Sequence, residues 1–310
     1  MRLATTTGDF ASCFSSDIEK LRAVAEAGFK YIDLSMYSGD DPGWVYSGED
    51  WEKRVDELGN EAARLGVKFV QAHAPGHTNL LSVGERRERI VSATARSCEV
   101  CARLGIKNNV IHTGTSGSLL YDRPEDKEKY FAANLDVLKD LFPVLEKTGV
   151  NLLVENSCKK NAGEKWFFFT GKEMKEFIDY CGHPLVHAAW DVGHAAIEGH
   201  QYQDIIDLGN DLRALHIHDN RGEDTHELPL SGKTNYDEIL TALIKIGYTG
   251  CFTMEADNVF YGFKRMRNHP ELQIYGNRFT AAPIKICEMG EKLLYEIGKY
   301  ILETYDLFEE

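Results

Sequence analysis

A short pattern recurs five times along the chain and restricts its fold more than any other feature. Each copy combines a helix-like end, a glycine and a short apolar stretch that ends in a polar residue. The copies are EAGFKYIDLS (26–35), RLGVKFVQAH (64–73), RLGIKNNVIH (103–112), KTGVNLLVEN (147–156) and KIGYTGCFTME (245–255). Glycine suits the position just after a helix, because it adopts the left-handed backbone that turns the chain there. The stretches are rich in Val, Ile, Leu and Phe, which is typical of strands buried on both faces.

Extended to the whole chain, the same reasoning predicts strands and helices in alternation. The strands are expected near residues 2–6, 31–35, 67–73, 107–112, 150–155, 185–191, 212–218 and 250–255. Apolar residues at helical spacing predict helices at about 17–27, 50–65, 85–104, 130–145, 171–181 and 235–246. Eight such units predict an α/β protein whose parallel sheet closes into a (β/α)8 TIM barrel. An open doubly wound sheet is the alternative, but TTTGDFASCF after the first strand is not the glycine-rich loop typical of that fold.

One barrel accounts for the chain, so we expect a single domain over residues 1–310. Residues 219–234 and 256–279 form long connections after the seventh and eighth strands, and connections of this length usually have a function. Residues 280–304 predict a long C-terminal helix that closes the barrel. Homo-oligomerisation through this helix is an open alternative to a monomer.

The charge and composition exclude several classes of function. Lys and Arg total 35 against 49 Asp and Glu, which gives a formal net charge of −14. Because this charge repels phosphate backbones and anionic lipids, we expect neither nucleic acid nor a membrane surface as partner. The N-terminus lacks a signal-peptide pattern, and seven scattered cysteines include a C-x-x-C only inside a predicted helix. These features predict a cytoplasmic protein that acts on a small molecule.

Four residues of metal-ligand type end four successive predicted strands. They are Glu155, Asp191, His216 and Glu255. In a (β/α)8 barrel the C-terminal ends of the strands converge on the active face, so these four side chains should form one site. Two Glu, one Asp and one His are an oxygen-rich set that suits one divalent ion. Mn²⁺ is the expected ion, and Mg²⁺, Co²⁺ and Zn²⁺ are the alternatives.

Other polar residues are expected at the same end of the barrel. The candidates for binding substrate are His73, His112, His194, His218, Arg221 and His226. His218 lies two residues after His216, so both side chains should face the same side of the strand. His73, His112 and His194 could instead bind a second metal. Asp224 and His226 lie in the long loop, where a role in the site and a solvated loop are equally open interpretations.

The ordered motifs AHAP, IHTG, VEN, WDVGHA, HIHDN, DTHELPLSGK and TMEAD resemble the sugar isomerase/epimerase superfamily of xylose-isomerase-like barrels. This superfamily includes ketose 3-epimerases and also family 2 of the abasic-site (AP) endonucleases. The resemblance covers about residues 1 to 256. Matched motif by motif, the single divalent ion of the ketose 3-epimerases falls on Glu155, Asp191, His216 and Glu255, with His218 as the alternative to His216.

The resemblance also implies roles for individual residues. The two glutamates, Glu155 and Glu255, would be the catalytic pair that transfers protons, and His194 would contact substrate oxygens. The chain departs from the family pattern in its longer loop around Arg221, which puts the equivalence of that arginine in doubt. It also has Ser231-Gly232-Lys233 where Gly-x-Gly is frequent in the family.

The leading hypothesis is therefore a metal-dependent isomerase or epimerase of a sugar or a sugar-like keto compound. Proton transfer would proceed through a metal-bound cis-enediolate. A first alternative is a lyase that uses the same site, such as a keto-inositol or dehydroshikimate dehydratase or a C-glycoside-cleaving enzyme. A second is an abasic-site nuclease of the endonuclease IV type, whose zinc ligands have plausible counterparts here. A barrel that only binds its ligand is the third.

Overall fold

The strands of the protein form one closed barrel, as predicted. The computed structural model describes the chain except residues 38–42, 77–78, 258 and 260 and the side chains of residues 261–264. Within the described residues the barrel strands are β1 (Arg2–Thr6), β2 (Tyr31–Ser35), β3 (Lys68–His73), β4 (Asn108–Ile111), β5 (Asn151–Glu155), β6 (Val186–Asp191), β7 (Leu212–His216) and β8 (Cys251–Met254). Their pairs are parallel, in the order β7-β6-β5-β4-β3-β2-β1-β8. The ring closes between β7 and β8, where Ile217 N donates to Thr253 O at 2.8 Å.

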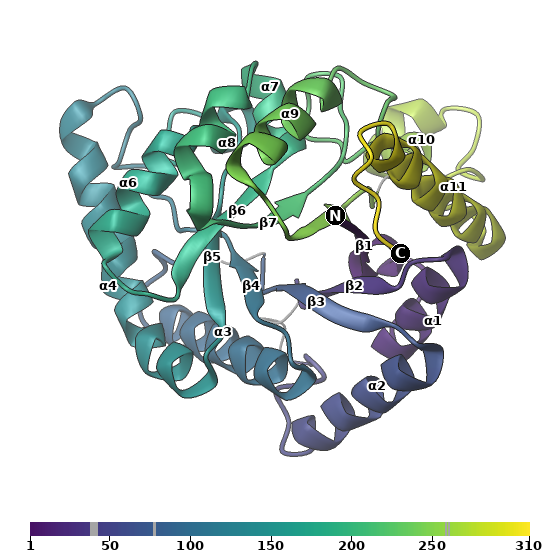
Figure 1. Cartoon of the computed structure of the whole chain (residues 1–310), viewed down its shortest axis with the longest axis horizontal. Helices are drawn as coiled ribbons and strands as arrows, with labels where there is room; N and C mark the ends of the chain where they lie inside the picture. The colour runs from purple at the N-terminus through teal and green to yellow at the C-terminus, as the bar shows by residue number, and fades with distance from the viewer. Residues whose placement is uncertain (38–42, 77–78, 258, 260) are drawn as a thin grey trace.

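Helices surround the barrel (Figure 1). The larger ones are α1 (Asp17–Ala27), α2 (Trp51–Leu65), α3 (Glu85–Leu104), α4 (Pro124–Thr148), α6 (Gly171–Cys181), α9 (Tyr236–Ile246) and α11 (Ile284–Glu303). The glycines of the recurring pattern follow helices, as the sequence predicted. Gly66 and Gly149 end α2 and α4 with φ of 71° and 65°, a conformation that costs a residue with a Cβ about 1 kcal/mol or more. No helix in the described part of the chain is long and apolar enough to cross a membrane.

Several short helices were not predicted. They are η1 (Thr7–Phe10), α5 (Lys159–Ala162), α7 (Val192–Glu198), α8 (Tyr202–Leu208), η2 (Gly209–Asp211), α10 (Tyr261–Asn268) and η3 (Pro270–Gln273). A helix of seven residues makes barely two turns, so it shows no repeating apolar pattern in the sequence. α7 begins directly from the tip of β6, where the side chain of Asp191 accepts from the backbone N of His194. The helix therefore presents its first turn to the barrel mouth.

The barrel interior is apolar on one side and polar on the other. Val110, Leu153, Ala189 and Ala214, from β4 to β7, form a separate buried cluster. Because side chains alternate along a strand, the residues two positions later also point inward, at the mouth. On β2, β3 and β8 the corresponding interior residues are polar and buried: Asp33, Gln71 and Thr253.

The C-terminal tail lies against the opposite end of the barrel, beside the start of β1. Met1, at the start of β1, donates from its amino group to the carboxylate of Glu309 at 2.9 Å, and Glu309 N donates to Met1 O at 3.0 Å. Both termini therefore lie near the N-terminal ends of the strands (Figure 1). The mouth that carries the acids and histidines stays open.

Candidate active site

The four predicted metal-ligand residues meet at the C-terminal end of the barrel. Glu155, Asp191 and His216 are the last residues of β5, β6 and β7, and Glu255 follows β8 directly. One ligand atom from each lies within 4.8 Å of those of the others. Nδ1 of His216 lies 2.5 Å from Oε1 of Glu155 and 3.3 Å from Oε2 of Glu255. Three carboxylates and one imidazole thus surround one point.

The structure assigns the two strand-seven histidines to different neighbours. His216 belongs to the group of four, whereas Nε2 of His218 lies 3.0 Å from Asp191. The ring of His218 is fully buried and stacks on His226 with a centroid separation of 3.9 Å. Gly193 leaves room for it, because a Cβ there would lie 2.0 Å from the ring of His218. His216 is therefore the candidate ligand.

A second group surrounds the other oxygen of Glu155. Nε2 of His112 lies 2.8 Å from Glu155 Oε2, and Nε2 of His73 lies 3.6 Å from the same atom. His73, from β3, and His112, directly after β4, make an edge-on ring contact at 4.9 Å. These three residues also have the spacing of a metal site.

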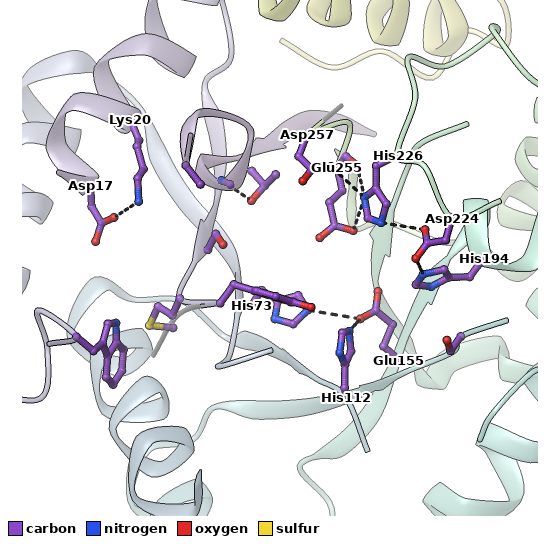
Figure 2. A pocket seen from close by; sticks show the side chains of 18 of the residues that line it. Asp17, Lys20, His73, His112, Glu155, His194, Asp224, His226, Glu255 and Asp257 are labelled. Atoms are coloured by element: carbon purple, nitrogen blue, oxygen red, sulfur yellow. Dashed lines mark hydrogen bonds and ion pairs between the residues drawn. The ribbon is translucent and has the colours of Figure 1, made fainter. Parts of the chain in front are cut away.

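A third group combines α7 with the loop after β7. It consists of His194, His218, Asp224 and His226. Nε2 of His194 lies 3.2 Å from one oxygen of Asp224, and Nε2 of His226 lies 3.1 Å from the other. Figure 2 shows His194, Asp224 and His226 on the same side of the pocket as Glu255. The loop after β7 therefore contributes directly to the site.

Three of these histidines share an orientation in which Nε2 faces a carboxylate. Nδ1 of His73, His194 and His226 lies 2.7, 3.0 and 2.9 Å from a backbone carbonyl, which can only accept, so Nδ1 carries a proton. In the neutral ring Nε2 then presents a lone pair, and here it faces a carboxylate. A proton or a metal ion between the ring and the carboxylate would satisfy both groups. In agreement, although burial opposes it, the neighbouring carboxylates raise the pKa of all three histidines.

His216 is held from behind by residues that the sequence analysis missed. Its Nε2 lies 3.5 Å from Oδ2 of Asp33, a carboxylate that is 1% exposed. Gln71 donates to the same oxygen at 2.7 Å and accepts from Thr253 at 3.3 Å. A carboxylate behind a ligating histidine fixes its ring and raises its basicity. The signal in the sequence was a charged residue in the middle of the apolar strand YIDLS.

The two glutamates of the site have opposite electrostatics. Burial would raise the pKa of Glu155, but the imidazoles of His216 and His112 hold it well below its usual value. Burial also raises the pKa of Glu255, and its neighbour Glu155 adds to the rise, so that His216 and His226 offset it only in part. Unlike environments for two nearby carboxyls are typical of sites where one group removes a proton and the other returns it.

A cavity of about 920 Å³ opens above these groups. Its lining includes six of the predicted site residues, namely His73, His112, Glu155, His194, His226 and Glu255. Asp191, His216 and His218 are buried below that surface. Arg221 is not brought to the site: its side chain is 73% exposed and pairs with Glu227 at 3.4 Å, outside the cavity lining. The prediction that Arg221 binds substrate therefore has no support in the geometry.

Residues 21–273 match the family model described as xylose isomerase-like TIM barrel. The chain belongs to this family. D-psicose 3-epimerase of Ruminiclostridium cellulolyticum is 24% identical over 294 residues, which cover 92% of this chain and 92% of the epimerase. The resemblance predicted from the motifs is thus confirmed at the level of the family.

Solved structures agree on the fold. A D-psicose 3-epimerase crystallised in the presence of D-fructose superposes with a TM-score of 0.70 at 20% identity, covering 97% of this chain and 99% of that one. The IOLI protein, whose structure contains a bound zinc atom, superposes with a TM-score of 0.70 at 17% identity, covering 98% and 99%. At these identities the likeness concerns the barrel and leaves the substrate open.

Proposed function

We propose that this protein is a divalent-metal-dependent isomerase or epimerase of keto sugars that works by proton transfer. One observation carries the proposal: Glu155, Asp191, His216 and Glu255 place their ligand atoms within 4.8 Å of one another at the barrel mouth. The sugar epimerases among its relatives support the choice of reaction.

The residues of the site fit a divalent ion. Three carboxylates and an imidazole, with a buried carboxylate behind the imidazole, are a donor set suited to Mn²⁺, Mg²⁺, Co²⁺ or Zn²⁺. Mn²⁺ is the ion that we propose. When bound, such an ion would polarise the carbonyl of a keto sugar and favour loss of the proton from the neighbouring carbon.

Glu155 and Glu255 would move the protons. They reach the site from β5 and β8, and both line the cavity. One carboxylate takes the proton from the carbon next to the carbonyl, and the electron pair of that C–H bond forms the double bond of an enediolate. The other carboxyl returns a proton to the opposite face, which inverts the carbon. His73, His112, His194 and His226 would contact the substrate hydroxyls.

A test in heavy water separates this reaction from its rivals. Incubation of D-fructose with the metal-loaded enzyme in D2O should yield a C3 epimer that carries deuterium on carbon. A product without deuterium would contradict proton exchange with solvent, and loss of water from the substrate would identify the lyase that shares this site. An Asp191→Asn variant should lose both the metal and the turnover.

A second candidate has a specific observation in its favour. The flanking groups around Glu155 and around Asp224 also have metal-site spacing, so the mouth could hold three ions, as an abasic-site nuclease of the endonuclease IV type would require. The net charge of −14 opposes a DNA substrate. Elemental analysis of protein purified without a metal-affinity tag decides between them. We expect one divalent ion per chain, whereas three zinc ions and cleavage of abasic DNA would establish the nuclease.

A further inference from the structure

The cavity is much larger than one keto sugar. If each carbon unit of a sugar fills about the volume of a water molecule, about 30 Å³, a hexose occupies on the order of 200 Å³. The cavity measures about 920 Å³, near the upper end of the ~300–1,000 Å³ typical of sites for drug-sized ligands. A hexose at the carboxylates would therefore leave most of the cavity to something else.

The remaining space lies across the mouth from the acids and histidines. It is lined by residues 11, 14 and 15 before α1, by Asp17 and Lys20 of α1, and by residues 36, 37 and 43–45 after β2. In the ring of eight strands β1 and β2 are opposite β5 and β6, which carry Glu155 and Asp191. Figure 2 shows Asp17 and Lys20 at one end of the pocket and His194 and Asp224 at the other. The cavity thus has a reactive end and a distal end.

The distal end presents an aromatic surface and a neutralised ion pair. Trp44 and Phe14 are partly buried and line the cavity. Trp44 is supported edge-on by Tyr46 at 5.5 Å, and Tyr46 donates to Asp17 at 2.8 Å. Lys20 donates to the other oxygen of Asp17 at 3.0 Å. The indole ring of Trp44 could pack against the apolar face of a second sugar ring, and the neighbouring polar groups could bind the hydroxyls of that ring.

The charges of the lining argue against an anionic substituent. Among the described residues that line the cavity, Lys20 is the one lysine or arginine, and Asp17 neutralises it. The carboxylates of Asp224, Glu255 and Asp257 line the same cavity. At the distal end a phosphate or a sugar acid would meet Asp17 and a lysine that is already paired with it. An uncharged substituent would meet no such repulsion.

We propose that the substrate is an uncharged glycoside of a keto sugar, with the keto sugar at the carboxylates and a second sugar ring on Trp44. The inference rests on the proposed function, because the reactive end is placed by Glu155 and Glu255. In a ketose the carbonyl and the reacting carbon lie at one end of the chain. The second ring is therefore attached at the other end, as in a 6-O-glycosyl ketose.

Calorimetric titration of the metal-loaded full chain tests the inference with 6-O-α-D-glucopyranosyl-D-fructose and D-fructose as probes. The disaccharide should bind with a Kd at least tenfold lower, the ratio that corresponds to about 1.4 kcal/mol. Trp44→Ala should raise the Kd of the disaccharide about tenfold and that of fructose much less. Trp51→Ala is the matched control. Trp51, the first residue of α2, is also partly buried, but it packs under Arg96 of α3, outside the cavity lining.

The outcomes distinguish this inference from the proposed reaction. Equal Kd values for the two sugars would overturn the proposal of a glycoside substrate, even if fructose is epimerised. An equal loss of affinity for both sugars in Trp44→Ala would overturn it too. Selective binding of the disaccharide that depends on Trp44 would uphold it even if no epimer forms, in which case the proposed reaction fails alone. Lys20→Met serves as a second variant, with the same selective loss expected.

Discussion

The half of the barrel mouth built by β5 to β8 and the half built by β1 and β2 use their carboxylates differently. In the first half each carboxylate faces imidazoles: Glu155 lies near three histidines and Asp224 lies between two. In the second half Asp17 is paired with a lysine and a tyrosine hydroxyl. Metal-ligand chemistry is thus concentrated on one side, and the other side has groups suited to binding a neutral surface.

The difference follows from how the strands enter the mouth. β5, β6 and β7 end at the mouth itself, so their last side chains point inward and are fixed by the sheet. After β1 and β2 the chain continues through η1 and the loop that carries Trp44 before the cavity lining is complete. We infer that the half built by β5 to β8, the reactive half, performs the chemistry and that the half built by β1 and β2, the looped half, selects the substrate. Four predictions test this division, from the largest expected effect to the smallest.

The first prediction concerns the reactive half. Glu155→Gln should lower turnover by about 10²- to 10⁴-fold, because it removes a group proposed to transfer protons. Steady-state kinetics with metal content measured on the same sample separates lost proton transfer from lost metal. Glu227→Gln is the control, since Glu227 pairs with Arg221 outside the cavity lining and should matter little. A fully active Glu155→Gln enzyme would remove the proposed mechanism.

The second prediction concerns the support behind this half. Asp33→Asn should weaken metal binding by about 10- to 100-fold, because the carboxylate behind His216 would be lost. Competition with a chelator measures the change. Asp126→Asn is the matched control: Asp126 is 3% exposed, like the buried Asp33, but it lies at the start of α4 away from the site. If both variants weaken metal binding alike, the effect comes from stability and not from His216.

The sequence predicted the barrel and much of the mouth because both depend on local signals. Glycines after helices and apolar runs gave all eight strands to within about two residues, as expected for strongly patterned segments. The rule that strand ends converge also brought Glu155, Asp191, His216 and Glu255 together without knowledge of any loop. Strand alternation alone could not separate His216 from His218, since both face the same side.

What the sequence could not give depends on contacts between distant segments. The loop after β7 is fixed by Asp219, whose carboxylate accepts from the backbone of Gly232 and Thr234, and this path turns Arg221 outward. Asp33 becomes meaningful only once β2 and β7 lie on facing sides of one interior. The distal end of the cavity likewise exists only because loops from two separate units meet.

The third prediction concerns the looped half. Lys20→Met should raise KM for the 6-O-glucosyl ketose by about three- to tenfold, the cost of one hydrogen bond, and change fructose turnover less. Kinetics on both sugars measures the split. Lys53→Met is the control, because Lys53 is a lysine of α2 whose side chain is 78% exposed. An equal effect on both sugars would show that the looped half does not select the substrate.

The last prediction concerns Asp9 and Glu291, two neighbouring carboxyls beneath the looped half. Each of them faces another acid, whereas the carboxylates of the reactive half face imidazoles. Glu291 on α11 is 2% exposed and accepts from Thr5 at 2.9 Å, and burial raises its pKa to about 7. Burial and the neighbouring Glu291 also raise the pKa of Asp9. The folded pair therefore binds more protons than the unfolded chain between about pH 4.5 and 7.

Stability must then fall as pH rises through this window, since each unit of pKa difference is worth about 1.4 kcal/mol. Glu291→Gln cannot ionise, so its stability relative to the parent protein should increase from pH 5 to pH 8. Urea unfolding with chelator present measures the change, and Glu296→Gln, at an exposed position of the same helix, is the control. Catalysis at the opposite half should change least of all in this variant. A constant difference between parent and variant across the window would mean that burial does not raise the pKa of Glu291 in the folded protein.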